Sequence, residues 1–176
     1  MKLIRRKYYI LVLLGVLFAA PGISAYIFYL HPSWLGGVTT NKGRLLNPPV
    51  LLAHAKPNSK WQLALWSPGA CEQSCIAELD KLARIRLALG RHLYKVQPQL
   101  LLDANAPPLA EPLAKALQEQ DIHTTRLSQE ELKNMSVLKD SLAIFIVNPD
   151  AYLVLAYQPT VKPQDIFHDL KQLVTK

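Results

Sequence analysis

The stretch Trp61–Leu79, WQLALWSPGACEQSCIAEL, decides how the rest of the chain is organised. It opens with an apolar run that predicts a buried strand, and the breaker Ser67–Gly69 follows. Cys71 and Cys75, the two cysteines of the chain, come next, and a helical pattern begins directly after them. A thiol at a helix N-terminus lies near unpaired backbone N–H groups and the positive end of the helix dipole, which favour the thiolate. Because the thiolate attacks disulfides and binds soft metals, the stretch predicts a redox-active or metal-binding thiol pair.

Two other interpretations of the cysteine pair remain open. The pair can be a structural disulfide, or two buried thiols without a role, since free cysteine is among the most buried residue types. A structural disulfide usually joins distant segments, however, and closing so short a loop constrains little of the unfolded chain. Residues four apart on a regular helix lie one turn apart on the same face. A disulfide therefore requires that Cys71 lie in the loop or that the helix open locally.

An apolar segment near the N-terminus predicts a membrane anchor. Tyr8–Leu30 contains no charged residue, and as a helix it matches the roughly 30 Å thickness of a hydrocarbon core. Residues 1–7 are rich in Lys and Arg, so the positive-inside rule keeps them in the cytoplasm and sends residues 31–176 to the periplasmic side of the inner membrane. The competing interpretation is a cleaved signal peptide with Leu11–Ala20 as its apolar region. Apolar sequence continues well beyond that region, so we expect an uncleaved single-pass anchor.

The net charge of +7 is concentrated at the N-terminus. Four of the 20 basic residues precede the apolar segment, so residues 31–176 carry 16 basic against 13 acidic residues. This part of the chain shows neither a Lys/Arg-rich run nor basic residues interleaved with aromatic ones, so nucleic acid is not an expected partner. The exported side of many bacteria is oxidising, and a close pair of cysteines there forms a disulfide unless it is reduced or metal-bound.

The exported part divides into an extended lead-in, residues 31–59, and a mixed α/β domain, residues 60–176. The lead-in is rich in proline and glycine, with short apolar pieces at 45–46 and 50–52 that can add an edge hairpin. The domain has the predicted order β-α-β-α-β-β-α. Its expected strands are 61–66, 94–102, 142–147 and 152–157, and its expected helices are 72–89, 109–120, opened by Pro107 or Pro108, and 163–174. The polar segment Asp121–Met135 is predicted to end in a short helix capped by Ser128, with Glu131 three residues later.

This order of elements is that of thioredoxin, and the chain resembles the Sco/SenC family of membrane-anchored, thioredoxin-like proteins that help assemble the copper site of cytochrome c oxidase. The resemblance lies in the N-terminal anchor, the strand and C-x-x-x-C loop of Trp61–Cys75, the Glu78-Leu79 pair, and the hairpin at Pro149-Asp150 with its closing helix. It covers roughly Asn47–Val174. It implies an α/β fold with a thioredoxin-like central sheet and flanking helices, preceded by one transmembrane helix.

The resemblance also implies a site. Cys71 and Cys75 would be copper ligands, or the redox pair that reduces the cysteines of the oxidase copper subunit. Two thiolates independently favour Cu(I) over hard cations. The family's third ligand is a histidine before the strand that leads to the Pro-Asp turn, and that position falls on Asp140, whose carboxylate is a hard ligand. His123 is the candidate substitute, and Ile76 stands where the family has a proline. Thiol–disulfide exchange needs only the two cysteines.

We therefore expect an anchored assembly factor for cytochrome c oxidase that performs thiol–disulfide exchange, Cu(I) delivery, or both. In exchange, Cys71 would be the attacking thiolate, with a depressed pKa, and Cys75 would resolve the mixed disulfide. Two alternatives stay open. One is a general exported thiol oxidoreductase without a metal, and the other is a non-catalytic thioredoxin-like scaffold that binds a membrane partner through its surface. A hydrolase is disfavoured, because no Ser/His/Asp or paired-carboxylate constellation stands out in the sequence.

Overall fold

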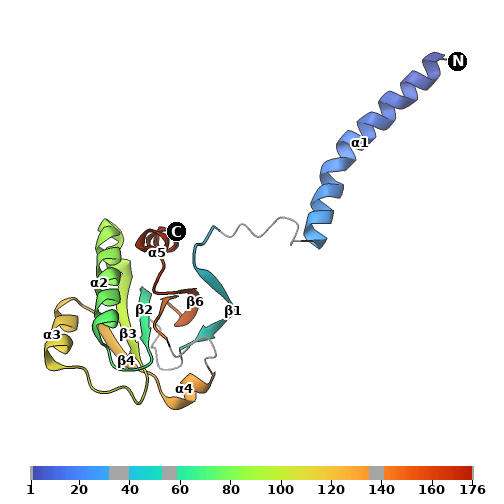
Figure 1. The fold of residues 1–176 in the computed structure, drawn as a ribbon. Coiled ribbons are helices and arrows are strands. Elements are labelled where there is room, and N and C mark those ends of the chain that lie inside the picture. The colour runs from blue at the N-terminus through green and yellow to red at the C-terminus, as the bar shows by residue number, and fades with distance from the viewer. Residues whose placement is uncertain (1, 32–39, 53–58, 135–140, 176) are drawn as a thin grey trace. The chain divides into compact units, whose positions relative to one another are not determined.

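The computed structural model describes residues 2–31, 40–52, 59–134 and 141–175, and the chain divides into two compact units, residues 1–40 and 41–176. The first unit contains helix α1, Lys2–Leu30 (Figure 1). Its segment Tyr8–Leu30 is exposed throughout, and it is long and apolar enough to cross a membrane. By length and composition, α1 is a candidate membrane-spanning helix.

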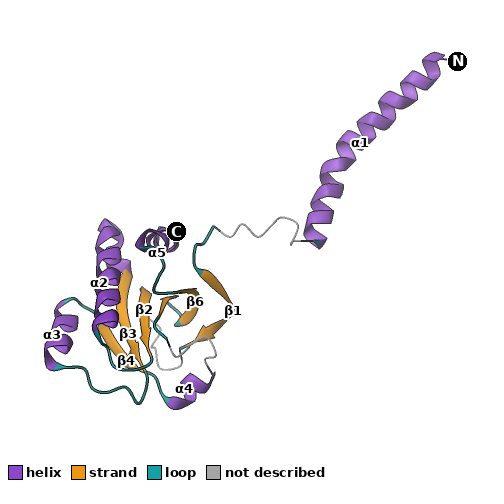
Figure 2. Ribbon diagram, in the orientation of Figure 1, coloured by secondary structure: helices purple, strands orange, loops and turns teal. Residues whose placement is uncertain are grey.

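The second unit is built on a six-stranded sheet with the strand order β1-β6-β5-β2-β3-β4 (Figures 1 and 2). The strands are β1 Arg44–Leu51, β2 Trp61–Ser67, β3 Val96–Leu102, β4 His123–Arg126, β5 Ala143–Val147 and β6 Tyr152–Tyr157. The helices are α2 Gln73–Ala88, the 3-10 helix η2 Gly90–Lys95, α3 Glu111–Glu119, α4 Gln129–Asn134 and α5 Pro163–Val174. Strands β2, β3 and β4 run parallel, whereas β5 is antiparallel to β2, β6 to β5, and β1 to β6. This is the expected α/β class.

The two faces of the sheet bury different side chains, because successive residues of a strand point to opposite faces. On β2, Leu63 and Leu65 join the cluster that includes α2 and α5, whereas Ala64 and Trp66 join the cluster on the other face. The α2 side chains in the first cluster form an apolar stripe at helical spacing, Cys75, Leu79, Leu82 and Ile85, which the C-cap residue Leu89 continues. Strand β2 lies between β3 and β5 with both faces covered, which explains its continuous apolar sequence.

The proline-rich lead-in contributes a strand to the sheet. β1 forms an outer edge and pairs with β6, with Leu45 opposite Leu155 and Leu51 opposite Tyr152. The register shifts between Leu45 and Val50, across two prolines that have no N–H to donate. The apolar pieces that suggested an edge hairpin therefore form a single interrupted edge strand.

Strand β4 is missing from the element order that the sequence suggested. Its four residues, HTTR, show no apolar alternation, and only the flanking Ile122 and Leu127 are buried. Tertiary pairing decides the strand, because β4 completes the sheet against β3 from Gln99 to Leu102. Pro98 of β3 lies just before this pairing begins, where a missing N–H disturbs the sheet least.

The start of α4 agrees with the prediction from the sequence, whereas the start of α3 differs from it. The capping box at α4 is confirmed, because Glu131 Oε2 accepts hydrogen bonds from Ser128 N at 2.8 Å and from Ser128 Oγ at 2.9 Å. Helix α3 begins at Glu111 with Pro112 in its first turn, so the expectation that the prolines at 107–108 open this helix is wrong. Proline suits any position of a first turn, where its N–H has no intrahelical partner, and the sequence offered three such prolines.

A buried carboxylate joins both ends of the second unit. Asp169 of α5 is 2% exposed. Its Oδ2 accepts hydrogen bonds from the backbone N–H of Lys42 at 2.7 Å, from that of Gly43 at 2.8 Å and from the hydroxyl of Tyr157 at 2.7 Å. Its Oδ1 lies 3.1 Å from Nδ1 of His168. Burial raises the pKa of Asp169, but these hydrogen bonds outweigh it and leave the pKa below its usual value, so the carboxylate stays ionised.

Candidate functional site

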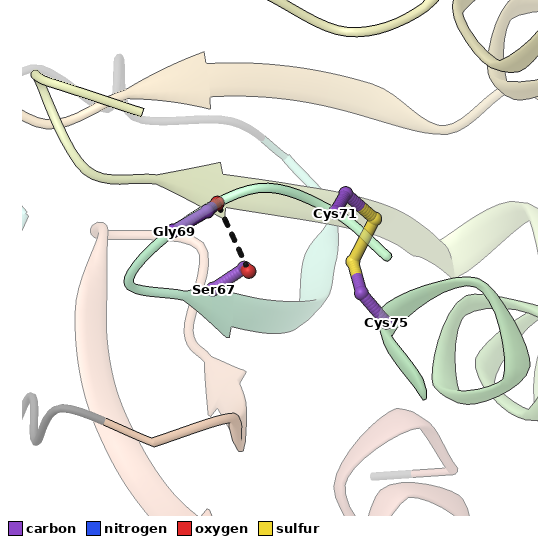
Figure 3. Close-up of a disulfide and its surroundings, with 4 residues drawn as sticks. All are labelled: Ser67, Gly69, Cys71 and Cys75. Atoms are coloured by element: carbon purple, nitrogen blue, oxygen red, sulfur yellow. Dashed lines mark hydrogen bonds between the residues drawn. A yellow bond between two sulfur atoms is a disulfide. The ribbon is translucent and has the colours of Figure 1, made fainter. Parts of the chain in front are cut away.

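The loop that carries the cysteines begins where the central strand ends. Ser67, the last residue of β2, donates a hydrogen bond from Oγ to the carbonyl of Gly69 at 3.4 Å (Figure 3). The carbonyl of Ser67 accepts a hydrogen bond from Asp103 N at 3.3 Å, which ties the end of β2 to the end of β3. Glu72 N then donates to the carbonyl of Ala70 at 3.0 Å and turns the chain into α2. The loop is thereby held at the C-terminal end of a buried strand.

Cys71 and Cys75 form a disulfide, with their Cα atoms 5.1 Å apart (Figure 3). Cys71 lies in the loop, and α2 begins at Gln73, so Cys75 is in the first turn of the helix. The structure therefore meets the first of the two conditions that the spacing set for a disulfide. The cysteines are not two separate buried thiols.

The two sulfur-bearing residues differ in exposure. Cys75 is 1% exposed and belongs to the apolar core, whereas Cys71 is half-buried and packs against the edge of that core. Cys71 is therefore the more exposed of the two residues, while Cys75 is covered by the protein.

The N-terminus of α2 provides the electrostatic environment of Cys71. Within the described part of the chain, the N-cap residue Glu72 makes no side-chain capping hydrogen bond, and the first turn of α2 contains no acidic residue. The N–H groups of the first turn are therefore free of a side-chain acceptor and favour negative charge near Cys71. The exposed carboxylate of Glu72 opposes this effect, since a like charge disfavours a thiolate.

A third metal ligand is not brought to the sulfurs by any described residue. No group of three or more His, Cys, Asp or Glu side chains in the described ranges is placed to hold a metal ion. His123 is on β4, in register with Gln99 of β3 and hence with Ala64 of β2, three residues before the strand end. That places it two strands across and about 10 Å along the strand from the cysteine loop. His123 is exposed, and its Nε2 lies 3.7 Å from Oδ1 of Asp121. Asp140 lies outside the described residues.

These features define a class: a thioredoxin-like domain with a C-x-x-x-C disulfide between its central strand and the following helix. A family model described as "transmembrane-like, thioredoxin-like, C-terminal domain" matches residues 61–175. The chain belongs to this family. No curated protein matches the sequence.

Solved structures with the same fold include Sco proteins. Copper-bound ScoI from Arabidopsis thaliana is 15% identical, with a TM-score of 0.53 over 68% of this chain and 86% of that one. Yeast Sco1 is 17% identical, also with a TM-score of 0.53, over 67% of this chain and 81% of that one. The predicted likeness to Sco proteins is confirmed at the level of the fold.

Proposed function

We propose that this protein is a membrane-anchored thiol–disulfide exchange factor that acts on the periplasmic side of the inner membrane, with the copper subunit of a respiratory oxidase as its client. The observation that supports exchange most directly is the disulfide at the N-terminus of α2, with one accessible and one buried cysteine. The choice of client rests on the sequence resemblance to Sco/SenC proteins and agrees with the shared fold.

The exchange reaction starts from the oxidised pair. A client thiolate attacks Sγ of Cys71, and Cys75 leaves as a thiolate and takes up a proton. A second client thiolate then attacks the client sulfur of the mixed disulfide and releases the thiolate of Cys71. Two electrons have passed from the client to the pair, and the client holds a new disulfide. In reverse, the thiolate of Cys71 attacks a client disulfide and Cys75 resolves the intermediate.

The environment of each cysteine supports its role in this sequence. The N–H groups at the start of α2 stabilise the thiolate of Cys71, whether it attacks or leaves. Burial restricts Cys75 to the neighbouring sulfur of Cys71, so the mixed disulfide forms at Cys71 alone.

Trapping of the mixed disulfide tests the proposal. In the full chain in detergent, the lone thiolate of Cys71 in Cys75→Ser should attack a client peptide that contains a disulfide, release one peptide thiolate and accumulate as a mixed disulfide, whereas Cys71→Ser should accumulate none. Ser74→Ala, in the same first turn, is the matched control and should exchange like the wild type. Equal trapping by both cysteine variants would contradict the assigned roles. If a strain carrying both substitutions still assembles its oxidase copper site, the scaffold alternative is correct.

Copper delivery is a second candidate, because the two sulfurs are soft donors held at one helix end. Copper would be cargo here, with Cys71 and Cys75 as its two described donors. Competition with a Cu(I) chelator under anaerobic conditions should show sub-nanomolar binding by the reduced full chain. Cys71→Ser with Cys75→Ser should remove this binding, and His123→Ala should not change it. If the reduced wild type does not bind Cu(I), the protein is an exchange factor without a metal.

The domain organisation is part of the same proposal. We assign residues 1–7 to the cytoplasm, 8–30 to an uncleaved transmembrane helix, 31–59 to a lead-in and 60–176 to the thioredoxin-like domain. Added protease should then digest the domain in spheroplasts without lysis. The intact protein should keep its full length in the membrane fraction, whereas a shortened soluble product would show that a signal peptide had been cleaved.

A further inference from the structure

A groove of about 960 Å³ lies at the end of the sheet that also carries the disulfide. One wall is the start of β5, where Ala143 pairs with Trp66, one residue before β2 ends and leads into the cysteine loop. The other wall is the loop 158–161. Lys81 of α2 donates a hydrogen bond to the carbonyl of Pro159 in this loop at 2.9 Å. Both walls are therefore attached to the elements that hold Cys71 and Cys75.

The floor of the groove crosses three strands. Arg44 of β1, Ala156 of β6 and Phe145 of β5 are neighbours in register and all line the groove. Register neighbours share one face of a sheet. Phe145 is buried and Ala156 is half-buried, so the floor presents a small apolar side chain over a packed ring, with a guanidinium at its outer end. Such a surface can hold the side chains of a polypeptide that lies across the end of the sheet.

The charged side chains among the described lining residues of the groove are both basic. Lys42 and Arg44 line it, both are exposed, and neither forms an ion pair within the described part of the chain. No acidic residue is among its described lining residues. The nearby carboxylate of Asp169 is buried and accepts hydrogen bonds from backbone N–H groups and from Tyr157. Two cations without an acidic partner leave a groove complementary to anionic side chains.

We propose that this groove binds a client segment with acidic side chains next to the reacting cysteine, and that Lys42 and Arg44 select clients by charge. This selectivity presupposes the exchange function proposed above. It places the recognition of the client at the start of β1 and the residues just before it, whereas the exchange chemistry takes place at the loop after β2.

The rate at which peptide thiols reduce the disulfide of the full chain tests this selectivity. Three peptides of equal length carry one cysteine flanked by Asp, Asn or Lys, and rates are compared per thiolate. In the wild type at low ionic strength, the Asp peptide should react about fivefold faster than the Lys peptide, and salt should remove the difference. Lys42→Glu with Arg44→Glu should invert the preference. Arg91→Glu with Lys115→Glu, which reverses two exposed cations outside the groove, should leave it unchanged.

A neutral thiol separates this inference from the exchange function. 2-Mercaptoethanol should reduce the disulfide at the same rate in all these variants. If it reduces the wild type but the Asp and Lys peptides react alike, charge selection by the groove is wrong and exchange stands. If no thiol reduces the chain, exchange is wrong. Fluorescence anisotropy with labelled peptides in which serine replaces cysteine then tests whether the groove prefers acidic segments. Tighter binding of the Asp peptide that is lost on reversing Lys42 and Arg44 would support the groove, and equal binding would overturn it.

Discussion

The cysteine loop and the Asp169 cluster are two polar centres in one domain, and they are assembled differently. The disulfide joins residues separated by four positions and keeps one of them half-exposed. Asp169 binds N–H groups 126 and 127 positions away and is almost completely buried. The disulfide is thus local and partly exposed, while the centre that joins distant segments is closed to solvent. We expect the first to determine chemistry and the second to determine stability.

The largest stability effect should follow a change at Asp169. Asp169→Asn removes the charge that accepts hydrogen bonds from two backbone N–H groups and the hydroxyl of Tyr157. We expect the free energy of unfolding to fall by about 3 kcal/mol, measured by denaturant titration of tryptophan fluorescence in the full chain. Asp165→Asn, on the same helix, is the matched control and should cost less than about 1 kcal/mol. Equal losses would show that the cluster has no special role.

The same pair of proteins predicts a pH dependence. The pKa of Asp169 is lowered in the folded state, so its contribution is complete above the unfolded-state value and is lost as the pH falls through the folded-state pKa. The difference in stability between wild type and Asp169→Asn should therefore be largest near neutral pH and shrink below about pH 4. His168, whose Nδ1 lies beside Oδ1 of Asp169, is unchanged in both proteins, so the difference between them reports on the Asp169 carboxylate.

Reduction of the disulfide should have a smaller effect. A loop closed over four positions removes little entropy from the unfolded chain, so reduction should lower the free energy of unfolding by at most about 2 kcal/mol. Denaturant titration of the wild type with and without a thiol reductant measures this directly, without any substitution. A loss greater than that caused by Asp169→Asn would reverse the comparison and favour a structural disulfide.

Removal of the Tyr157 hydroxyl should lower the free energy of unfolding by less than reduction of the disulfide does. Tyr157→Phe deletes the hydrogen bond to Oδ2 of Asp169 and keeps the buried ring, so we expect a loss of about 1 kcal/mol. Tyr152→Phe, at an exposed position of the same strand, should leave stability unchanged. A double-mutant cycle with Asp169→Asn should be strongly non-additive, because the two side chains share one hydrogen bond.

The smallest effect concerns the reactive centre. Glu72 is exposed and adjacent to Cys71, so Glu72→Gln removes a like charge and should lower the pKa of the reduced Cys71 thiol slightly. We expect alkylation of Cys71 near neutral pH to accelerate by no more than about twofold, given the screening of exposed charges. Glu111→Gln, in the first turn of α3, should leave the rate unchanged. A slower reaction in Glu72→Gln would mean that Glu72 assists the thiolate.

The parts of the fold that the sequence predicted correctly depend on local signals. The apolar run of β2, the breaker after it and the helical stripe of α2 follow one another, and the structure has that order. Ser128 and Glu131 predicted their own capping box for the same reason. Strand β4 gave no such signal, because a short polar strand exists only through its pairing with β3. The expected start of α3 was wrong because three prolines offered equivalent first turns.

The candidate site also has features that the sequence predicted and features that only the structure shows. The spacing of Cys71 and Cys75 restricted the ways in which they can pair, but only the structure shows that Cys71 is half-buried and Cys75 is buried. On α5, Ile166 and Leu170 are buried as their apolar side chains lead one to expect, and Asp169 between them is also buried, which a carboxylate does not suggest. The signal for its burial lies in its partners, Gly43 and Tyr157. A Cβ at Gly43 would overlap the ring of Tyr157, and this close approach cannot be deduced from either residue alone.

The sequence by itself determined the α/β order, the apolar N-terminal helix and the position of a thiol pair at a helix start, because each depends on residues a few positions apart. The tertiary structure alone decided that β1 is a single strand paired with β6, that β4 exists, that Lys42 and Arg44 line a groove, and that Asp169 is buried. These features arise where segments far apart in the chain pack together, and their stability comes from contacts that no local pattern encodes.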